Sequence, residues 1–351
     1  MGFLRLLFAF AVVSNHYSHH QIFDLLYASV AVKGFYIISG FYMALILNNN
    51  SYIRNKQFYL SRFFRLYPVY ISCVIITIIF GLGNTTSGTN ILSDNLEIFP
   101  SIFIIFTNLT MIFQDLTMIT GINGNNIEIV KYFADSKPSP IYNYLYVPQA
   151  WSLGLELSFY LVAPFLLRNI KIERILAFIV LSLAIRGFLM AKGFKEDPWN
   201  YRFFPSEIAL FLAGSISYIF YKKELFFKDK DIQKILTFFI FCFVASYSYL
   251  RIPEKDIIFY VCLIILLPTI FICTKNMKLD KFFGDLSYPV YCCHILVFHF
   301  FINKVEFLSL NPTGFIQTTI SYAIVSIVAI ILYYFIQVPS DKIRNKLKSN
   351  K

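Results

Sequence analysis

The sequence predicts an all-α membrane protein, a polytopic bundle of about ten transmembrane helices with both termini on the cytoplasmic side. Of the 351 residues, 57% are hydrophobic and only 15% are charged, and the mean hydropathy is +0.62. This composition excludes a water-soluble globular protein. Apolar stretches of about twenty residues recur along the chain, which is the length that a helix needs to cross ~30 Å of hydrocarbon. Basic residues gather in alternate connections, as expected for cytoplasmic loops.

Hydropathy places ten spans along the chain. They lie near residues 4–21, 27–47, 64–83, 148–168, 174–191, 203–221, 234–250, 256–273, 285–303 and 316–337. A further apolar stretch, 98–113, is not counted as a crossing, because it would move the later basic loops to the side opposite the basic loop 48–63. We expect 98–113 to lie in the interface or to re-enter the membrane.

The distribution of basic residues sets the orientation. With ten spans, the cytoplasmic segments hold 21 of the 31 Lys and Arg residues, and the opposite side holds eight. The net charge of +11 is therefore explained by topology and by contact with the lipid bilayer, and no nucleic-acid partner is expected. Residues 1–340 are predicted to form an integral membrane domain of the inner (plasma) membrane, and 341–351 a basic cytoplasmic tail.

The first span carries the most unusual charges, an arginine near its start and histidines near its end. The eleven residues from Arg5 to His16 turn through about three full circles plus ~20° and rise ~16 Å. Both side chains are therefore predicted on one face of the helix, about half a membrane apart. The apolar run leads into NHYSHH rather than a small-residue cleavage site, so we expect this span to be retained.

Ionisable residues within the spans suggest acid–base chemistry. His16, Glu156 and His294 are each predicted near the middle of the membrane. An imidazole can take a proton from a hydroxyl while a carboxylate orients the ring and stabilises the imidazolium. The alternative is that these groups only hydrogen-bond helices together.

A metal site is not expected. His16 and His20 have the i, i+4 spacing of a helical zinc site, but no HExxH motif or cysteine ligands accompany them. All six cysteines fall in or at the ends of spans without a CxxC pair, which favours neither a disulfide framework nor a metal centre.

The basic segment RNKQFYLSRFFRLYP suggests a second site. Arg62 and Arg65 are three residues apart on the same helix face, and paired guanidinium groups at a membrane mouth suit phosphate-bearing ligands. Contact with anionic lipid is the alternative. On the outer side, residues 138–151 form an aromatic approach that could stack a sugar acceptor, although interfacial anchoring explains most of these rings.

Five motifs together resemble the acyltransferase family 3 membrane O-acyltransferases, over nearly the whole chain. They are Arg5 with His16, KGFYIISGFYM, SRFFRLYPVY, WSLGLELSFYLVAPF and GDLSYPVYCCHILVF, in the family's order. Two departures are visible. Gln337 stands where the family often has a glutamate of an E-x-P sequence, and no soluble esterase-like domain is expected after the membrane region.

The resemblance implies acyl transfer, usually acetyl from acetyl-CoA, to a hydroxyl of a cell-surface or lipid-linked carbohydrate. It makes His16 the general base, oriented by Glu156, while Arg5 steadies the donor or the pocket. Arg62 and Arg65 would bind the donor phosphates, with the pantetheine arm reaching from Arg5 toward His16. The resemblance also implies a set of pocket-lining residues, namely Lys33, Ser39, Trp151, Ser152, Tyr160, Tyr288 and His294.

The residues leave three alternatives open. A covalent acyl-histidine or acyl-serine intermediate is conceivable, since Ser39 and Ser152 lie within the matching motifs. A glycan or lipid transporter would also use buried charges, but no pair of interrupted hydrophobic helices indicates an inverted repeat. Within the family, the donor could carry an acyl group other than acetyl.

Overall fold

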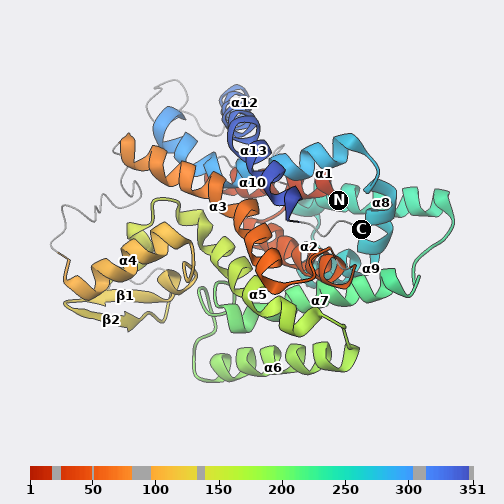
Figure 1. Cartoon of the computed structure of the whole chain (residues 1–351), viewed down its shortest axis with the longest axis horizontal. Coiled ribbons are helices and arrows are strands. Elements are labelled where there is room, and N and C mark those ends of the chain that lie inside the picture. Colours follow the sequence, from red (N-terminus) through yellow and green to blue (C-terminus); the bar gives the residue numbers. More distant parts are fainter. Residues whose placement is uncertain (18–24, 50, 81–95, 133–138, 303–313, 348–351) are drawn as a thin grey trace. The chain divides into compact units, whose positions relative to one another are not determined.

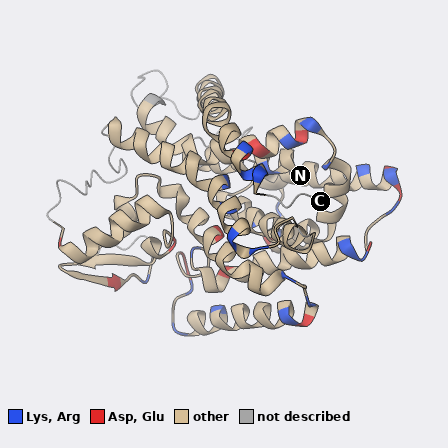
Figure 2. Cartoon of the chain, viewed as in Figure 1, with Lys and Arg blue, Asp and Glu red and all other residues tan. Residues whose placement is uncertain are grey.

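The computed structural model describes residues 1–17, 25–49, 51–80, 96–132, 139–302 and 314–347. Within these ranges the chain is helical apart from one small sheet, and eight helices are long and apolar enough to cross a membrane. This confirms the predicted all-α polytopic fold. Figure 1 shows the elements along the chain. Figure 2 shows that the middles of most helices carry no charged residue, whereas charges gather at helix ends and in connections.

A helix occupies each of the ten predicted spans. The bounds are α1 Gly2–Tyr17, α2 Ala28–Asn48, α3 Asn55–Ile79, α5 Trp151–Leu167, α6 Ile172–Ala191, α7 Phe204–Lys222, α8 Lys230–Ser246, α9 Lys255–Thr274, α10 Lys278–Val297 and α12 Phe315–Leu332. Two π-helices, η6 Phe298–Ile302 and η7 Tyr333–Gln337, continue α10 and α12.

Two of these ten helices, α1 and α10, are not among the eight candidate spans. The described part of α1 has 16 residues, fewer than a crossing needs. Helix α10 has 20 residues, but its first turn carries Lys278, Asp280 and Lys281, which lowers its apolar character. The remaining eight predicted spans are confirmed as helices of sufficient length and hydropathy.

The segment that the sequence places on the outer side differs from the predicted spans. Helix α4, Ile98–Thr110, has 13 residues and is only ~20 Å long, too short for a crossing and in agreement with the prediction for 98–113. A small antiparallel sheet follows, in the order β2-β1-β3, with strands Thr120–Asn123, Asn126–Ile129 and Ser139–Pro140. Sequence analysis missed this sheet. Its hairpin turn uses Gly124 at a φ of +59°, a conformation that glycine adopts without strain.

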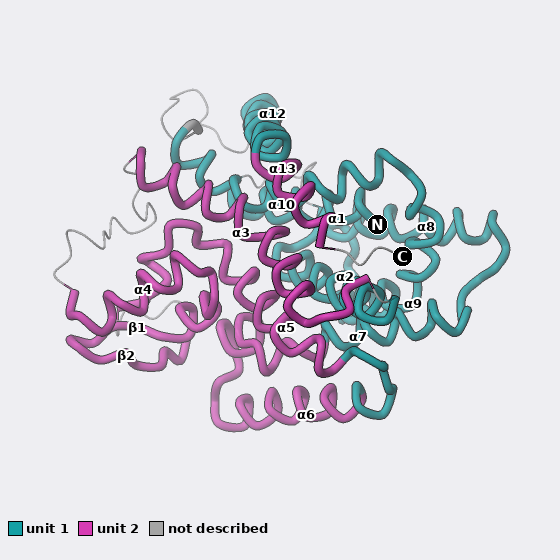
Figure 3. Tube along the Cα trace, in the orientation of Figure 1, with its two compact units in different colours: residues 1–49, 167–175, 210–335 teal, residues 50–166, 176–209, 336–351 magenta. Residues whose placement is uncertain are grey.

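The chain divides into two compact units, coloured separately in Figure 3. Unit 1 comprises Met1–Asn49, Leu167–Ile175 and Leu210–Phe335, and unit 2 comprises Asn50–Leu166, Leu176–Ala209 and Ile336–Lys351. Each unit is assembled from segments that are far apart in the sequence.

In unit 1, α1 packs against α2 and α10, and α10 also packs against α12. Helices α1 and α10 approach closely, since a Cβ atom on Gly284 would lie 2.8 Å from the Cα atom of Gly2. Asp280 of α10 accepts hydrogen bonds from the backbone amides of Gly2 and Phe3 at 2.8 and 2.9 Å. The start of α1 is thereby capped by a side chain of α10.

In unit 2, α4 and the small sheet share an apolar core of Ile104, Ile141 and Tyr144. Asn108 of α4 fixes the chain before α5, because its side-chain amide donates to the Tyr144 carbonyl at 3.0 Å and its carbonyl accepts from the Tyr146 amide at 2.9 Å. Three short 3-10 turns complete the described connections, η2 Leu116–Met118 and η3 Ile141–Tyr144 in unit 2 and η5 Tyr247–Tyr249 in unit 1. A further turn, η4 Pro148–Ala150, leads directly into α5.

The stretch predicted as a basic tail begins inside a helix. Helix α13, Val338–Lys346, packs against α3 within unit 2. The hydroxyl of Ser340 donates to the Phe64 carbonyl of α3. The residues just after the last predicted span are therefore fixed against the helix that carries Arg62 and Arg65.

Candidate active site

The histidine of the first span lies at the described end of α1. His16 is exposed and Arg5, eleven residues earlier on the same helix, is half-buried. An exposed imidazole can meet a substrate, which a buried one cannot do without a change in structure. His19 and His20 lie outside the described residues, so the predicted i, i+4 pair of His16 and His20 does too.

Unit 1 brings together His16 and His294, two of the three mid-membrane residues that the sequence selects. Their ring centroids are 5.2 Å apart, and the rings are tilted by 43°. His294 is fully buried on α10, between the rings of Tyr291 and Phe298 at 5.9 and 5.8 Å. The two imidazoles therefore form a pair on adjacent helices within an aromatic surrounding.

The other predicted lining residues of unit 1 lie on α2 and α10. Lys33 is half-buried, while Ser39 and Tyr288 are buried. Gly40, beside Ser39, lets α2 approach α7 closely, because a Cβ atom there would lie 1.7 Å from the Phe211 carbonyl oxygen. The small residues of this motif thus have a packing role, which the sequence alone did not reveal.

Arg62 in unit 2 is a buried cation without an acidic partner among the residues that the structure describes. Its guanidinium donates to the Ser61 hydroxyl at 3.1 Å and lies 5.8 Å from the ring centroids of both Phe58 and Tyr160. It forms no ion pair with the described residues, and its Nε has no hydrogen-bond partner among them. A guanidinium that is only 9% exposed in this state is suited to an anionic ligand.

Glu156 is connected to Arg62 through a tyrosine. The Tyr160 hydroxyl, one helical turn along α5, donates to Oε1 of Glu156, and the Tyr160 ring lies against the Arg62 guanidinium. Unit 2 thereby joins the basic motif of α3 to the carboxylate motif of α5. Trp151 and Ser152 are buried at the start of α5.

Arg65 is held differently from Arg62. Its guanidinium lies 3.6 Å from a carboxylate oxygen of Asp341 on α13, and Asp341 also pairs with Arg344 at 2.9 Å. The two arginines predicted to bind the donor together are therefore unequal, since only one of them has an acidic partner within the described residues.

The predicted residues are divided between the two units. Unit 1 holds Arg5, His16, Lys33, Ser39, Tyr288 and His294, and unit 2 holds Arg62, Arg65, Trp151, Ser152, Glu156 and Tyr160. The pairing of His16 with Glu156 joins residues of different units and stays a prediction.

Two residues near the predicted site were missed by the sequence reasoning. Arg202 stacks on Trp151 at 4.4 Å and forms two hydrogen bonds with Asp197, at 2.7 and 3.0 Å. Asp115 is buried beside α5, where its backbone amide would be 3.0 Å from a Cβ atom on Gly154. No spacing in the sequence marks either contact, because both join segments that are distant along the chain.

Burial raises the pKa of Asp115 from its ordinary value of 3.8 to about 7, although backbone amides partly oppose this rise. Its Oδ1 atom has no hydrogen-bond partner among the described residues. The charged form of this side chain is therefore costly in the folded protein.

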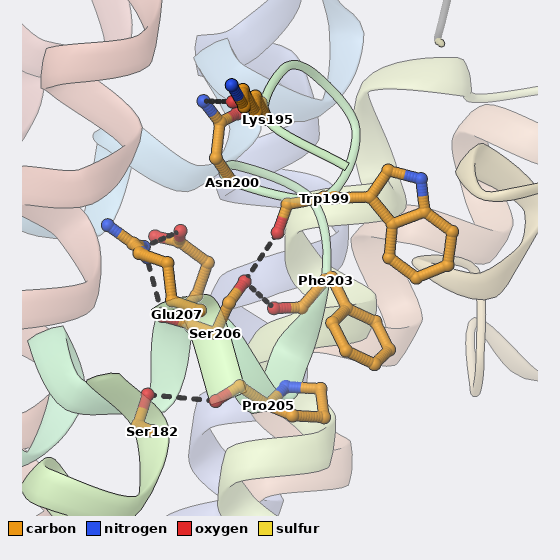
Figure 4. A network of polar contacts seen from close by, with 9 residues as sticks. Ser182, Lys195, Trp199, Asn200, Phe203, Pro205, Ser206 and Glu207 are labelled. Carbon is orange, nitrogen blue, oxygen red and sulfur yellow. Dashed lines mark hydrogen bonds and ion pairs between the residues drawn. The ribbon is translucent and has the colours of Figure 1, made fainter. Parts of the chain in front are cut away.

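Arg186 and Glu207, two further ionisable residues within predicted spans, have a structural role. Arg186 of α6 pairs with the buried Glu207 of α7 and donates to the Ser206 carbonyl at 3.0 Å. Figure 4 shows the surrounding network, in which Ser182 donates to the Pro205 carbonyl at 2.8 Å. For this pair, the interpretation that intramembrane charges join helices is sufficient.

The fold and these residues define a polytopic helical membrane protein with an imidazole pair and a buried guanidinium. Residues 1–336 match the family model described as an acyltransferase domain, and the chain belongs to acyltransferase family 3. It is thus a membrane acyltransferase, as its motifs predict.

The chain is also similar to an uncharacterized protein of Aquifex aeolicus (strain VF5). The two are 24% identical over 202 residues, which cover 52% of this chain and 86% of the relative. No solved structure matches the chain with significance.

Proposed function

We propose that this acyltransferase moves an acyl group, most simply acetyl, from a cytoplasmic acyl-CoA to a hydroxyl of a cell-surface or lipid-linked carbohydrate. The enzyme would act in the inner (plasma) membrane. The observation that carries the proposal is Arg62, a buried guanidinium with no acidic partner among the described residues. A phosphate-bearing donor such as acetyl-CoA would supply the missing negative charge.

The donor site is built around Arg62. The rings of Phe58 and Tyr160 lie beside the guanidinium, and its burial strengthens its attraction for phosphate. Arg65 would add a second positive charge, reduced by Asp341. Arg5 would steady the donor or the pocket, because the ~16 Å of helix between Arg5 and His16 suits a pantetheine arm that reaches from Arg5 toward His16.

His16 would act as general base on the acceptor. Its imidazole takes the proton of the sugar hydroxyl while the hydroxyl oxygen forms a bond to the thioester carbonyl carbon. The carbon–sulfur bond then breaks, and the CoA thiolate receives the proton from the imidazolium. The products are the sugar ester and CoA, and His16 returns to its neutral form. The sequence assigns the orientation of the ring to Glu156.

The acceptor would approach along the aromatic segment 138–151. Trp151 is already stacked with Arg202, so the half-buried rings of Tyr142 and Tyr146 are the better candidates for sugar contact. Stacking of sugar rings on such aromatic side chains is favourable and tolerant of the exact sugar.

Mass spectrometry of surface glycans tests the proposal. Cells that produce the protein should carry an acyl ester, of acetyl mass, that is missing from cells without it and reduced in cells that produce the Arg62→Ala variant. Identical glycans in all three would contradict the proposal. A change only in the amount of unmodified glycan at the surface would instead indicate a transporter.

A further inference from the structure

His294 has a defined tautomer in the structure. Its Nδ1 atom lies 2.8 Å from the Tyr291 carbonyl oxygen, one turn earlier on α10. A carbonyl oxygen can only accept, so Nδ1 must carry the hydrogen and donate it. The Nε2 atom of a neutral His294 is therefore an acceptor with a lone pair.

This acceptor is buried and has no partner in the described part of the chain. His294 is 0% exposed, and Nε2 has no hydrogen-bond partner among the described residues. A buried polar atom without a partner is costly, and the cost usually has a functional reason. Tyr291 and Phe298 flank the ring and cannot satisfy Nε2 with their ring faces.

The ring of His16 can supply a hydrogen-bond donor to Nε2. Its centroid lies 5.2 Å from the centroid of the His294 ring. His16 is exposed at the described end of α1, and His294 is held by Tyr291. The close contact of α1 and α10 at Gly2 and Gly284 fixes the spacing of the two helices. A small rotation of the His16 ring would bring one of its nitrogens to Nε2 of His294.

We propose that His294 is the positioning residue of His16. Its Nε2 accepts the N–H of one His16 nitrogen, so that the other His16 nitrogen presents its lone pair to the acceptor hydroxyl. When His16 takes the hydroxyl proton, the same hydrogen bond stabilises the imidazolium. This inference rests on the proposed function, and it gives His294 the orienting role that the sequence assigned to Glu156.

Two isosteric variants separate this role from a packing role. In His294→Asn, the side-chain amide reaches the place of Nδ1 and keeps the bond to Tyr291, but Nε2 is lost. In His294→Gln, the amide reaches the place of Nε2 and can offer an acceptor oxygen there. We expect kcat to fall about tenfold to thousandfold in His294→Asn with little change in either KM, and to recover in part in His294→Gln.

A double-variant cycle tests whether His294 acts through His16. In a His16→Ala background, His294→Asn should cause no further loss of the residual rate, because the partner that it positions is already gone. Thermal unfolding in detergent checks that every variant is folded. A folded His294→Asn with full activity, or one with the same loss in both backgrounds, would overturn the inference. Full activity of His16→Ala alone would instead overturn the proposed base.

Discussion

The predicted reactive residues of unit 1 and the predicted charged residues of unit 2 are held in different ways. In unit 1, the buried His294 has an acceptor nitrogen with no partner among the described residues, and it lies beside an exposed His16. In unit 2, Glu156 accepts a hydrogen bond from the Tyr160 hydroxyl, and Arg65 is paired with the carboxylate of Asp341. Arg62 is the exception, since its charge is enclosed by rings and lacks an acidic partner among the described residues.

This difference separates groups that react from groups that bind. A general base needs an available lone pair, and a hydrogen-bond donor that occupied this lone pair would lower its capacity to take a proton. A binding residue benefits from a fixed orientation, because less side-chain entropy is then lost when the ligand arrives. Of the charged residues in unit 2, Arg62 combines a fixed orientation with uncompensated charge, which makes it the strongest candidate for donor binding.

The largest effect is expected for His16. His16→Ala should lower kcat by about 100-fold to 10,000-fold, because the hydroxyl proton then has no positioned acceptor. His299→Ala provides the matched control, since His299 is a half-buried histidine on η6 with no assigned role. Its rate should stay within about threefold of the parent protein. Comparable losses in both variants would show that the loss in His16→Ala reflects a general effect on folding and not the role of a base.

The next-largest effect is expected for substitution of Arg62, and it should appear in the KM for the donor. Loss of a charged hydrogen bond of about 1.5–3 kcal/mol would raise the KM for acetyl-CoA by about tenfold or more in Arg62→Ala. Arg62→Lys keeps the charge but loses the planar fork. Its KM for acetyl-CoA should therefore lie between those of the parent protein and Arg62→Ala. Initial rates at varied donor and acceptor concentrations measure both constants. An equal rise in the acceptor KM would point to a general disturbance of unit 2.

Asp115 should make the stability of the protein depend on pH. The unfolded chain loses this proton near pH 3.8, but the folded chain keeps it to about pH 7, so stability falls as the pH rises between these values. Asp115→Asn should remove that loss, which is a few kcal/mol at most. Thermal unfolding should therefore show a more stable variant at pH 8 and nearly equal proteins at pH 4. A variant that is weakened equally at both pH values would refute this interpretation.

Asp341 should have the smallest effect. Asp341→Asn removes the carboxylate beside Arg65, so the positive field at the donor site increases and the KM for acetyl-CoA should fall about twofold to fivefold. The effect should shrink as salt is added, because α13 lies partly exposed to solvent. A higher KM would mean that Asp341 orients Arg65 instead of opposing the donor.

Much of the fold follows from the sequence, because span length and the positive-inside pattern depend on local composition. All ten predicted spans coincide with helices, and the short α4 agrees with the exclusion of an eleventh crossing. The small sheet was missed because its strands are short and hold few apolar residues. The packing of α13 on α3 was not predicted, because the contacts of Ser340 and Asp341 with α3 join residues that are far apart in the sequence.

The site could be predicted as a set of residues but not as a set of contacts. The motifs identified His16, His294, Arg62 and Glu156 by type and order along the chain. They could not show that Arg65 pairs with Asp341, or that Arg62 has no acidic partner among the described residues. Such pairings arise from helix packing, and residue types and spacings within one helix do not determine them.

Transfer by the purified protein in proteoliposomes tests the central claim most directly. Radiolabelled acetyl-CoA is supplied with a soluble oligosaccharide acceptor, and alkali-labile label on the acceptor is measured. We predict that the parent protein forms this ester and that His16→Ala forms it at least about 100-fold more slowly. An equal rate in the two proteins, or passage of unmodified glycan across the membrane without any ester, would contradict the account.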